Sequence, residues 1–336
     1  MLDGACGREL EVAVWAVARA ARLCRAVRVD LRPEVLAKAD SSPVTIADFG
    51  AQAVIGEALL GAFPNDPVIS EEDSAELAKP ENAGLLARTT GYFNRVAGRN
   101  ETDRVGPDAV RRLIDHGATE HASARFWTVD PIDGTKGFLR GGQYAVALAL
   151  VVEGRVVVAA LACPELESGG DQGAPGAIFF AVRGQGAHVI HESGVEGIAA
   201  NARRIGVRAE ADPAEAVYCE SLESKHSAQE ESALVAARLG IKAKPVRIDS
   251  QAKYALVARG EADLYPRLPT RKDYREKIWD HAAGALLVEE AGGTVTDITG
   301  RPLEFHHGRE LVANQGVVVS NGRFHQAVIA AINARR

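Results

Sequence analysis

The feature that most constrains this chain is a six-residue motif that directly follows a short apolar run. The run, residues 126–129, is aromatic and β-branched and predicts a buried strand. The motif reads Asp130-Pro131-Ile132-Asp133-Gly134-Thr135. Because Pro131 removes a backbone donor and Gly134 permits an unusual backbone angle, we predict that the chain leaves the strand and turns here. Two aspartates held rigidly on such a turn can share a hard cation such as Mg²⁺. The simpler interpretation is a surface turn, which commonly contains Asp, Pro and Gly.

Acidic residues in three other segments have simple explanations when each is considered alone. Asp48 lies in the first turn of a predicted helix, where a carboxylate complements the helix dipole. Glu71, Glu72 and Asp73 follow a predicted strand at 68–70; they form either a solvated charged run or a strand end that directs one acid at a metal. Asp280 lies at the predicted start of a helix, where free N–H groups attract anions such as phosphate.

The pattern of apolar residues indicates a mixture of helices and strands. Helical spacing predicts an amphipathic helix over 9–27, and two β-prone runs at 144–152 and 156–163 predict a hairpin. From about residue 200 strands and helices alternate, which is typical of a sheet covered by helices. In such sheets ligands bind at strand ends. His226, Ser250 and Lys253 lie at predicted strand ends, although they can equally be an exposed histidine, a helix cap and a surface lysine.

Composition and charge exclude several classes of function. The chain has 336 residues and a formal net charge of −6, so we expect no nucleic-acid polymer as partner. The longest apolar run, 144–152, is too short to cross a bilayer, and we expect no membrane partner. The four cysteines contain no CxxC pair, which argues against zinc or a disulfide framework and favours a reducing, cytoplasmic location, with an organelle as the alternative. We expect a monomer.

Taken in order, these segments resemble one family of enzymes. The order Asp48, Glu71, the Asp130–Thr135 motif and Trp279-Asp280 is similar to that of the metal-dependent, lithium-sensitive inositol monophosphatase superfamily. Within it, the chain resembles the 3′(2′),5′-bisphosphate nucleotidases of plants and fungi, enzymes of sulfur metabolism. The residues that carry this narrower likeness are 135–141, 250–254 and 274–281.

The resemblance implies a fold and a division of the chain. The implied fold is an α/β layered sandwich of the inositol monophosphatase and fructose-1,6-bisphosphatase type, with alternating layers of helix and sheet. Residues 1–200 would form an N-terminal α+β half that carries most metal ligands. Residues 201–336 would form a C-terminal α/β half that carries the nucleotide-binding residues and Asp280.

The resemblance also implies a role for each matched residue. Two or three Mg²⁺ ions would be held by Glu71, Asp130, the backbone carbonyl of Ile132, Asp133 and Asp280. Because the acidic segment departs from the usual family pattern, Glu72 stays the alternative to Glu71. Asp48 and Thr135 would orient and deprotonate the attacking water. The substrate would be bound by Thr135, His226, Ser250, Lys253, Arg267 and Asp280.

The activity that the resemblance implies is Mg²⁺-dependent hydrolysis of the 3′-phosphate of adenosine 3′,5′-bisphosphate to AMP and phosphate. The related 3′-phosphoadenylyl sulfate would be a further substrate. Phosphate-ester hydrolysis needs charge neutralisation and a positioned water, which metal ions held by several carboxylates supply. Two alternatives stay open: a phosphatase of inositol mono- or polyphosphates, and a non-catalytic nucleotide sensor.

Overall fold

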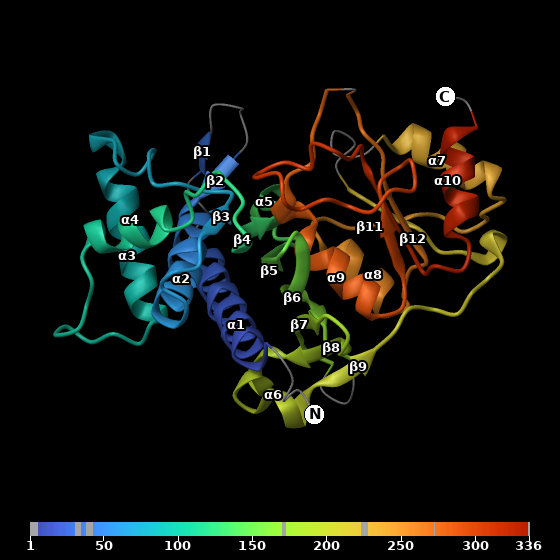
Figure 1. Cartoon of the computed structure of the whole chain (residues 1–336). Coiled ribbons are helices and arrows are strands. Elements are labelled where there is room, and N and C mark those ends of the chain that lie inside the picture. Colours follow the sequence, from blue (N-terminus) through green and yellow to red (C-terminus); the bar gives the residue numbers. More distant parts are fainter. Residues whose placement is uncertain are drawn as a thin grey trace.

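The computed structural model describes residues 6–30, 35–37, 43–169, 173–222, 228–271 and 273–334. These residues form alternating layers of helix and sheet, which Figure 1 shows side by side from α3 and α4 at one end to α7 and α10 at the other. The layered α/β sandwich predicted from the sequence is thus confirmed. The division at residue 200 stays a prediction, since strand β9, Arg203–Ile205, still pairs with β8.

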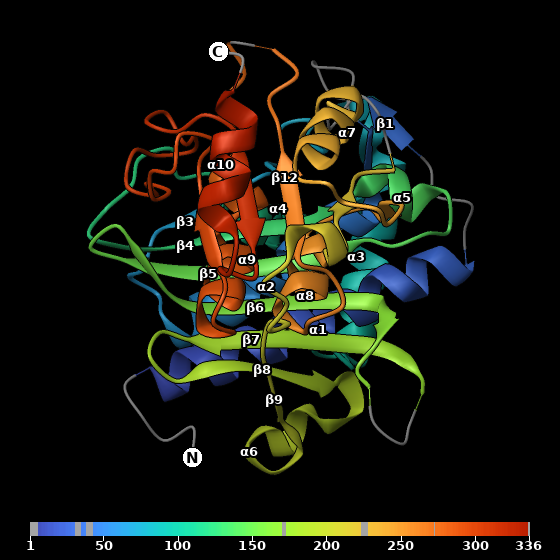
Figure 2. The same ribbon diagram turned by 90° about the vertical axis from the view of Figure 1, so that its right-hand side faces the viewer.

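Within the described residues, seven strands form the central sheet, in the order β3-β4-β5-β6-β7-β8-β9. Figure 2 shows this order across the face of the sheet. Only the β3–β4 pair is parallel among the ladders of this sheet in the described chain. The predicted hairpin is confirmed as β5 and β6. The other strand bounds of this sheet are β3 Val68–Ser70, β4 Arg125–Asp133, β5 Ala145–Val152, β6 Arg155–Glu167, β7 Pro175–Val182 and β8 Gly186–His191.

One face of the central sheet is covered by two long helices, α1 and α2. Helix α1 packs on β5, β6 and β7, whereas α2 packs on β4 and is covered in turn by α3 and α4. The predicted N-terminal helix is confirmed, with apolar residues buried along its length. The bounds are α1 Gly7–Asp30, α2 Ile46–Ala62, α3 Ala83–Val96 and α4 Pro107–Asp115. The short strands β1 Val35–Ala37 and β2 Pro43–Thr45 pair just before α2.

The opposite face of the sheet is covered by α9, which packs on β5 to β8 and on α8. Beyond α8 lies a smaller antiparallel sheet, ordered β12-β14-β13, and then helices α7 and α10. The helices on this side are α7 Gln229–Arg238, α8 Ala252–Ala258, α9 Ala282–Glu290 and α10 His325–Asn333, whereas α6 Ile198–Asn201 lies beside β8. The strands are β10 Cys219–Glu220, β11 Val246–Arg247, β12 Leu264–Arg267, β13 Thr294–Thr296 and β14 Val317–Ser320.

The structure differs from the predicted turn at the central motif. Strand β4 does not stop at Val129 but continues to Asp133, with its pairing to β5 interrupted between Asp130 and Asp133. Pro131 lies in this interval and has no N–H to donate, which accounts for a bulge inside the strand. The glycine-rich segment that follows is also more regular than expected, since Thr135–Leu139 forms the short helix α5.

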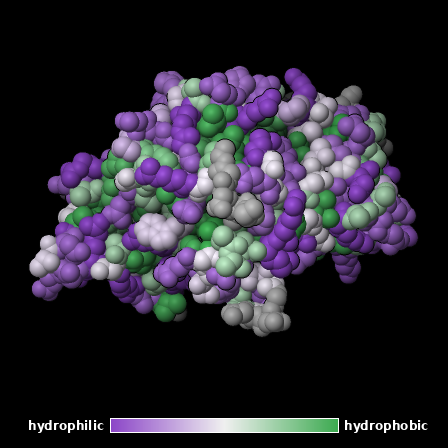
Figure 3. Space-filling view, turned by 60° about the horizontal axis from the view of Figure 1, so that its bottom comes forward, coloured by the Kyte–Doolittle hydropathy of each residue, from purple (hydrophilic) through white to green (hydrophobic). Residues whose placement is uncertain are grey.

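None of the helices in the described part of the chain is both long and apolar enough to span a bilayer. Figure 3 shows that hydrophilic side chains are interspersed with smaller hydrophobic groups on the face viewed there. The oligomeric state and the cellular compartment stay predictions from the sequence.

A buried histidine ties α10 to the smaller sheet. The side chain of His325 is 3% exposed, and its ring lies between the hydroxyls of Thr296 and Ser320, each 2.8 Å from one ring nitrogen. The Thr296 hydroxyl donates to the carbonyl of Asp297, so it accepts from Nε2–H of His325, and Nδ1 accepts from Ser320. Burial lowers the pKa of His325 from 6.5 to about 4.

We expect this histidine to make the protein less stable in mild acid. In the unfolded chain the imidazole takes up a proton below its ordinary pKa of 6.5, whereas in the folded chain it stays neutral until about 4. The unfolded state therefore binds more protons in this window, and the free energy of unfolding falls by about 3 kcal/mol as the pH drops through it. The His325→Gln variant, whose amide can serve both hydroxyls, should lack this component in urea denaturation at about pH 7.5 and about pH 4.5. Equal pH slopes for both proteins would contradict the assignment.

Candidate active site

A cavity of about 440 Å³ opens between the end of β4, the start of α8 and the turn before α9. Acidic and basic side chains line it together. The acids are Glu71, Asp130, Asp133, Asp249 and Asp280, and the bases are Lys136, Lys253, Lys277, Arg267 and Arg309. Thr135, Ser250 and Ile132 also line it. Segments more than 200 residues apart in the sequence, 71 and 280, therefore meet in one place.

The bulge in β4 explains how both aspartates of the motif reach this cavity. Before the bulge Trp127 and Val129 pack in the core beneath α1 and α2, so Asp130 faces the opposite side of the sheet. After the bulge Ile132 packs in that same core. The alternation is shifted by one residue, and Asp133 therefore joins Asp130 on the side of α8 and α9, whereas a regular strand would place them on opposite faces.

The structure distinguishes Glu71 from Glu72. Both follow β3, but Glu71 lines the cavity and Glu72 is not among the lining residues. The backbone of Glu72 is held at both ends by the side chain of Gln52, whose Nε2 donates to the Glu72 carbonyl and whose Oε1 accepts from its N–H. Glu72 is 6% exposed. This anchoring at α2 favours Glu71 as the acid that faces the cavity.

Asp48 and Thr135 lie beside each other at the start of α2 and of α5. Thr45 is the N-cap of α2 and Asp48 completes its capping box, since Asp48 Oδ2 accepts from the N–H of Thr45 at 2.7 Å and from the Thr45 hydroxyl at 2.6 Å. Its other oxygen, Oδ1, is 3.4 Å from the hydroxyl of Thr135. The same hydroxyl is 3.1 Å from the carbonyl of Ile132. Asp48 is buried and does not line the cavity, so Thr135 stands between it and the open space.

A strained turn before α8 fixes the position of Asp133. Ser250 has φ 68°, a conformation that costs energy in a residue with a side chain. The following N–H, of Gln251, donates to Asp133 Oδ2 at 2.6 Å. Gly134 lies against this turn, and a Cβ there would be 3.1 Å from that of Ser250. Burial raises the pKa of Asp133, and the carboxylate of Glu71 adds to that rise, while Lys253 and Arg267 oppose it.

Asp280 lies two residues before the start of α9 rather than within it. It ends a short 3₁₀ turn, Ile278–Asp280, and α9 begins at Ala282. Burial raises the pKa of Asp280 well above its ordinary value; Arg267 opposes the rise, whereas Asp133 and Glu71 add to it. Two buried acids whose pKa values are raised, each with a neighbouring carboxylate adding to the rise, form a site where a divalent cation would replace protons.

Arg267 forms ion pairs with two carboxylates. Its Nε is 2.7 Å from Glu276 Oε2, and its Nη2 is 3.4 Å from Asp280 Oδ2. Behind Glu276, Nε2 of His281 lies 3.1 Å from Oε2, and Nδ1 of His281 lies 2.6 Å from the hydroxyl of Tyr254. Although burial alone would raise it, Arg267 and the hydrogen bond from His281 lower the pKa of Glu276 to about 2. This buried chain of contacts holds Arg267, and through it Asp280, in place.

Lys253 extends from α8 into the cavity wall. The side chain is 3% exposed, and its Nζ donates to the carbonyl of Ile248 at 3.2 Å and lies 5.2 Å from the ring centre of Tyr265. Burial lowers the pKa of Lys253, and the charge of Asp133 opposes this effect. A buried ammonium beside a cavity is a strong point of attraction for an anion.

The predicted site residues that the structure describes thus come together at the cavity. Glu71, Asp130, Ile132, Asp133, Thr135, Ser250, Lys253, Arg267 and Asp280 all line the cavity, with Asp48 directly behind Thr135. His226 lies outside the described residues. Sequence reasoning gave no role to Lys277, Tyr274 or Arg309, which also line the cavity. Arg309 lies in an irregular loop whose apolar spacing has no period, so no pattern could have indicated it.

Comparison with known proteins matches this chain to one family over nearly its whole length. The profile of the inositol monophosphatase family matches residues 8–336. The chain belongs to the inositol monophosphatase family.

Curated relatives within that family share a more specific name. A protein from Emericella nidulans named 3′(2′),5′-bisphosphate nucleotidase is 43% identical over 97% of this chain and 97% of its own length. A protein of the same name from Oryza sativa is 43% identical over 96% of this chain and 93% of its own. Among solved structures, the Thermotoga maritima IMPase superposes with a TM-score of 0.65 over 97% of both chains, at 21% identity. That likeness confirms the inositol monophosphatase fold.

Members of the inositol monophosphatase family are metal-dependent phosphatases, and the lining of this cavity suits a metal. Its acids offer only oxygen atoms, the donors that hard dications prefer. Burial and neighbouring carboxylates raise the pKa values of Asp133 and Asp280, and a bound dication would favour their charged forms.

Proposed function

We propose that this protein hydrolyses the 3′-phosphate of adenosine 3′,5′-bisphosphate to AMP and phosphate, with Mg²⁺ as its cofactor. One observation carries the proposal: a single cavity joins the cluster of carboxylates to a separate cation, Lys253, that is buried and lies in its wall. A substrate with two phosphates needs both features. The carboxylate cluster, with its bound metal, would act on the reacting phosphate, and the buried cation would bind the other phosphate. The related 3′-phosphoadenylyl sulfate, which also carries two anionic groups, is proposed as a further substrate.

The carboxylates are proposed to hold two or three Mg²⁺ ions. Glu71, Asp130 and Asp133, with the carbonyl of Ile132, would supply ligands from the side of β4, and Asp280 would supply one from the side of α9. When bound, the ions would neutralise the charge of the phosphoryl group and favour deprotonation of a water. Magnesium fits this lining better than zinc does, since the described residues that line the cavity include no cysteine or histidine.

Thr135 and Asp48 are proposed to position the attacking water and to accept its proton. The Thr135 hydroxyl faces the cavity and is 3.4 Å from Asp48 Oδ1. Asp48 cannot move far, because its other oxygen is fixed by the N–H and hydroxyl of Thr45. A proton taken up by the threonine oxygen can therefore pass to a carboxylate held at hydrogen-bond distance.

The other end of the substrate is proposed to lie over α8. Lys253 would bind the 5′-phosphate as a point charge, and Ser250 at the turn before α8 would bind beside it. Arg267 and His226 are retained from the resemblance as substrate-binding residues. The contacts of Arg267 with Glu276 and Asp280 make it, in addition, a support for the proposed metal ligand.

An assay of purified protein on a panel of phosphate esters tests the proposal. With Mg²⁺ we expect release of phosphate and formation of AMP from adenosine 3′,5′-bisphosphate, and loss of turnover in EDTA or in millimolar lithium. Inositol monophosphate should be a much poorer substrate. Preference for inositol phosphates would establish the alternative within the family. Tight nucleotide binding without release of phosphate would instead establish a sensor.

Arg309 is expected to support the metal ligands from outside the cluster. Its guanidinium lies 4.6 Å from the ring centre of Trp279, and its Nη2 is 3.5 Å from the carbonyl oxygen of Glu71. It thus bridges the segments that carry Glu71 and Asp280. Arg309→Met should raise the Mg²⁺ concentration needed for half-maximal rate and lower kcat/KM about tenfold, the equivalent of one such cation–π contact. Arg323→Met, at an exposed arginine, is the control; an unchanged metal dependence in Arg309→Met would contradict this role.

A further inference from the structure

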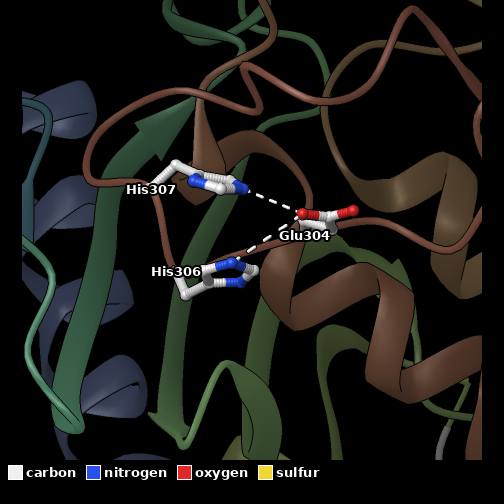
Figure 4. Close-up of side chains that lie close together, drawn as sticks. All are labelled: Glu304, His306 and His307. Atoms are coloured by element: carbon white, nitrogen blue, oxygen red, sulfur yellow. Dashed lines mark hydrogen bonds and ion pairs between the residues drawn. The ribbon is translucent and has the colours of Figure 1, made fainter.

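A second group of potential metal ligands lies outside the cavity, in the loop between β13 and β14. The group consists of Glu304, His306 and His307, whose ligand atoms all lie within 4.8 Å of one another. Figure 4 shows both imidazole rings turned toward the same carboxylate. Nε2 of His307 is 2.8 Å from Glu304 Oε2, and Nε2 of His306 is 3.8 Å from that same atom. None of the three lines the cavity described above.

The segment that carries these side chains is anchored on both sides. The N–H of Glu304 donates to Asn314 Oδ1 at 2.8 Å, and the side chain of Phe305, between the ligands, is 5% exposed in the core. Gly308 has φ 96°, and a Cβ at that position would come within 2.9 Å of the carbonyl oxygen of Glu120. The backbone therefore presents the two histidines in a fixed direction.

A neighbouring turn also fixes the orientation of the His306 ring. It lies against the turn between β5 and β6, where a Cβ added at Gly154 would be 3.2 Å from His306 Nδ1. With Nδ1 facing that turn, Nε2 is the nitrogen left toward Glu304. The two imidazole rings lie with their centres 4.0 Å apart. Bringing two histidines and a carboxylate to one point is favourable when a cation occupies that point.

We propose that Glu304, His306 and His307 bind a transition-metal dication of the Zn²⁺ class. Two imidazole nitrogens and one carboxylate oxygen suit zinc and its neighbours, whereas Mg²⁺ prefers oxygen ligands alone. Ligand atoms around a tetrahedral zinc are about 3.3 Å apart, given bonds of about 2.0–2.1 Å. The distances from Glu304 Oε2 to the two histidine nitrogens, 2.8 and 3.8 Å, bracket that value, and the ligand atoms of the two histidines lie within 4.8 Å of each other, so rotation of the side chains would bring all three to one ion. Water would complete the coordination, because the side chains of His306 and His307 are partly exposed.

A zinc titration against a chromophoric chelator tests the site, with the protein kept saturated with Mg²⁺ so that the catalytic carboxylates are occupied. We expect the wild-type protein to bind one more equivalent of Zn²⁺ than the His306→Asn/His307→Asn variant does. Glu304→Gln, which keeps a hydrogen bond to His307 but removes one charged ligand, should bind that equivalent more weakly. His191→Asn, at a histidine outside the cluster, is the matched control and should bind as wild type.

Thermal unfolding gives an independent reading of the same site. Since a ligand that binds only the folded state stabilises it, Zn²⁺ should raise the melting temperature of wild type more than that of the double variant. Melting without zinc checks that the variants fold. Equal zinc stoichiometry and equal zinc-dependent shifts in wild type and the double variant would overturn the proposal. Binding of any zinc at the carboxylate cavity is common to both proteins and cancels in the comparison.

Discussion

Asp133→Asn is expected to abolish turnover while leaving the fold intact. In the wild type the N of Gln251 lies 2.6 Å from Asp133 Oδ2. The substitution keeps an oxygen that can accept this hydrogen bond, but it removes the negative charge that binds a metal. Loss of one ligand of a catalytic metal removes several kcal/mol of transition-state stabilisation, so we expect kcat/KM to fall by at least about 10³-fold. Phosphate release from adenosine 3′,5′-bisphosphate under saturating Mg²⁺ measures the effect.

The stability of the same variant separates a catalytic role from a structural one. Burial raises the pKa of Asp133 and Glu71 adds to the rise, so the metal-free protein holds this charge at a cost. Without metal, Asp133→Asn should melt at the same temperature as wild type or higher. With Mg²⁺ the wild type should gain stability and the variant should not. Asp108→Asn, at an exposed acid in the first turn of α4, is the control. Activity within tenfold of wild type would contradict the role of Asp133 as a ligand.

Lys253→Met is expected to change substrate preference rather than destroy activity. Methionine has a similar length and keeps the buried contacts, but it removes the proposed contact with the 5′-phosphate. A hydrogen bond to a charged group contributes about 1.5–3 kcal/mol, so kcat/KM for adenosine 3′,5′-bisphosphate should fall about 100-fold. Hydrolysis of a phosphate ester with a single phosphate should change less than about threefold, since it has nothing to place at Lys253.

Lys253 rather than Arg267 is substituted to test the second phosphate site because the two residues have different contacts. Arg267 is bound to Glu276 and Asp280, so its removal would leave buried charges unpaired and disturb the proposed metal site as well. Lys253 contacts a backbone carbonyl and an aromatic ring. Lys242→Met, at an exposed lysine, is the matched control. An equal loss on both substrates would show that Lys253 acts through Asp133 and not on the second phosphate.

The set of acids could be predicted from the sequence, but its geometry could not. The sequence places Asp48, Glu71, Asp130, Asp133 and Asp280 at predicted strand ends or helix starts, and their order resembles that of one family. The choice between Glu71 and Glu72 needed the structure, because it depends on Gln52, a residue of α2 that anchors the backbone of Glu72. No local pattern relates positions that are so far apart.

The predicted turn at the central motif was wrong for a physical reason. Proline and glycine indicate where a regular ladder must break, but not whether the chain turns away or continues after a bulge. Here β4 resumes its pairing at Asp133, opposite Ala145 of β5, so the strand continues. The consequence is functional, since the shift in alternation brings Asp130 and Asp133 to one face. Residues such as Arg309 and Lys277 could not be predicted, because tertiary contacts alone bring their loops to the cavity.

Diffraction from crystals grown with Mn²⁺ and AMP, recorded at the manganese absorption edge, tests the central claim most directly. Manganese substitutes for Mg²⁺ at oxygen sites and can be located by its anomalous signal. We predict peaks between Glu71, Asp130, Asp133 and Asp280, with the 5′-phosphate of AMP beside Lys253. Manganese bound elsewhere, or bound by Glu72 in place of Glu71, would contradict the account.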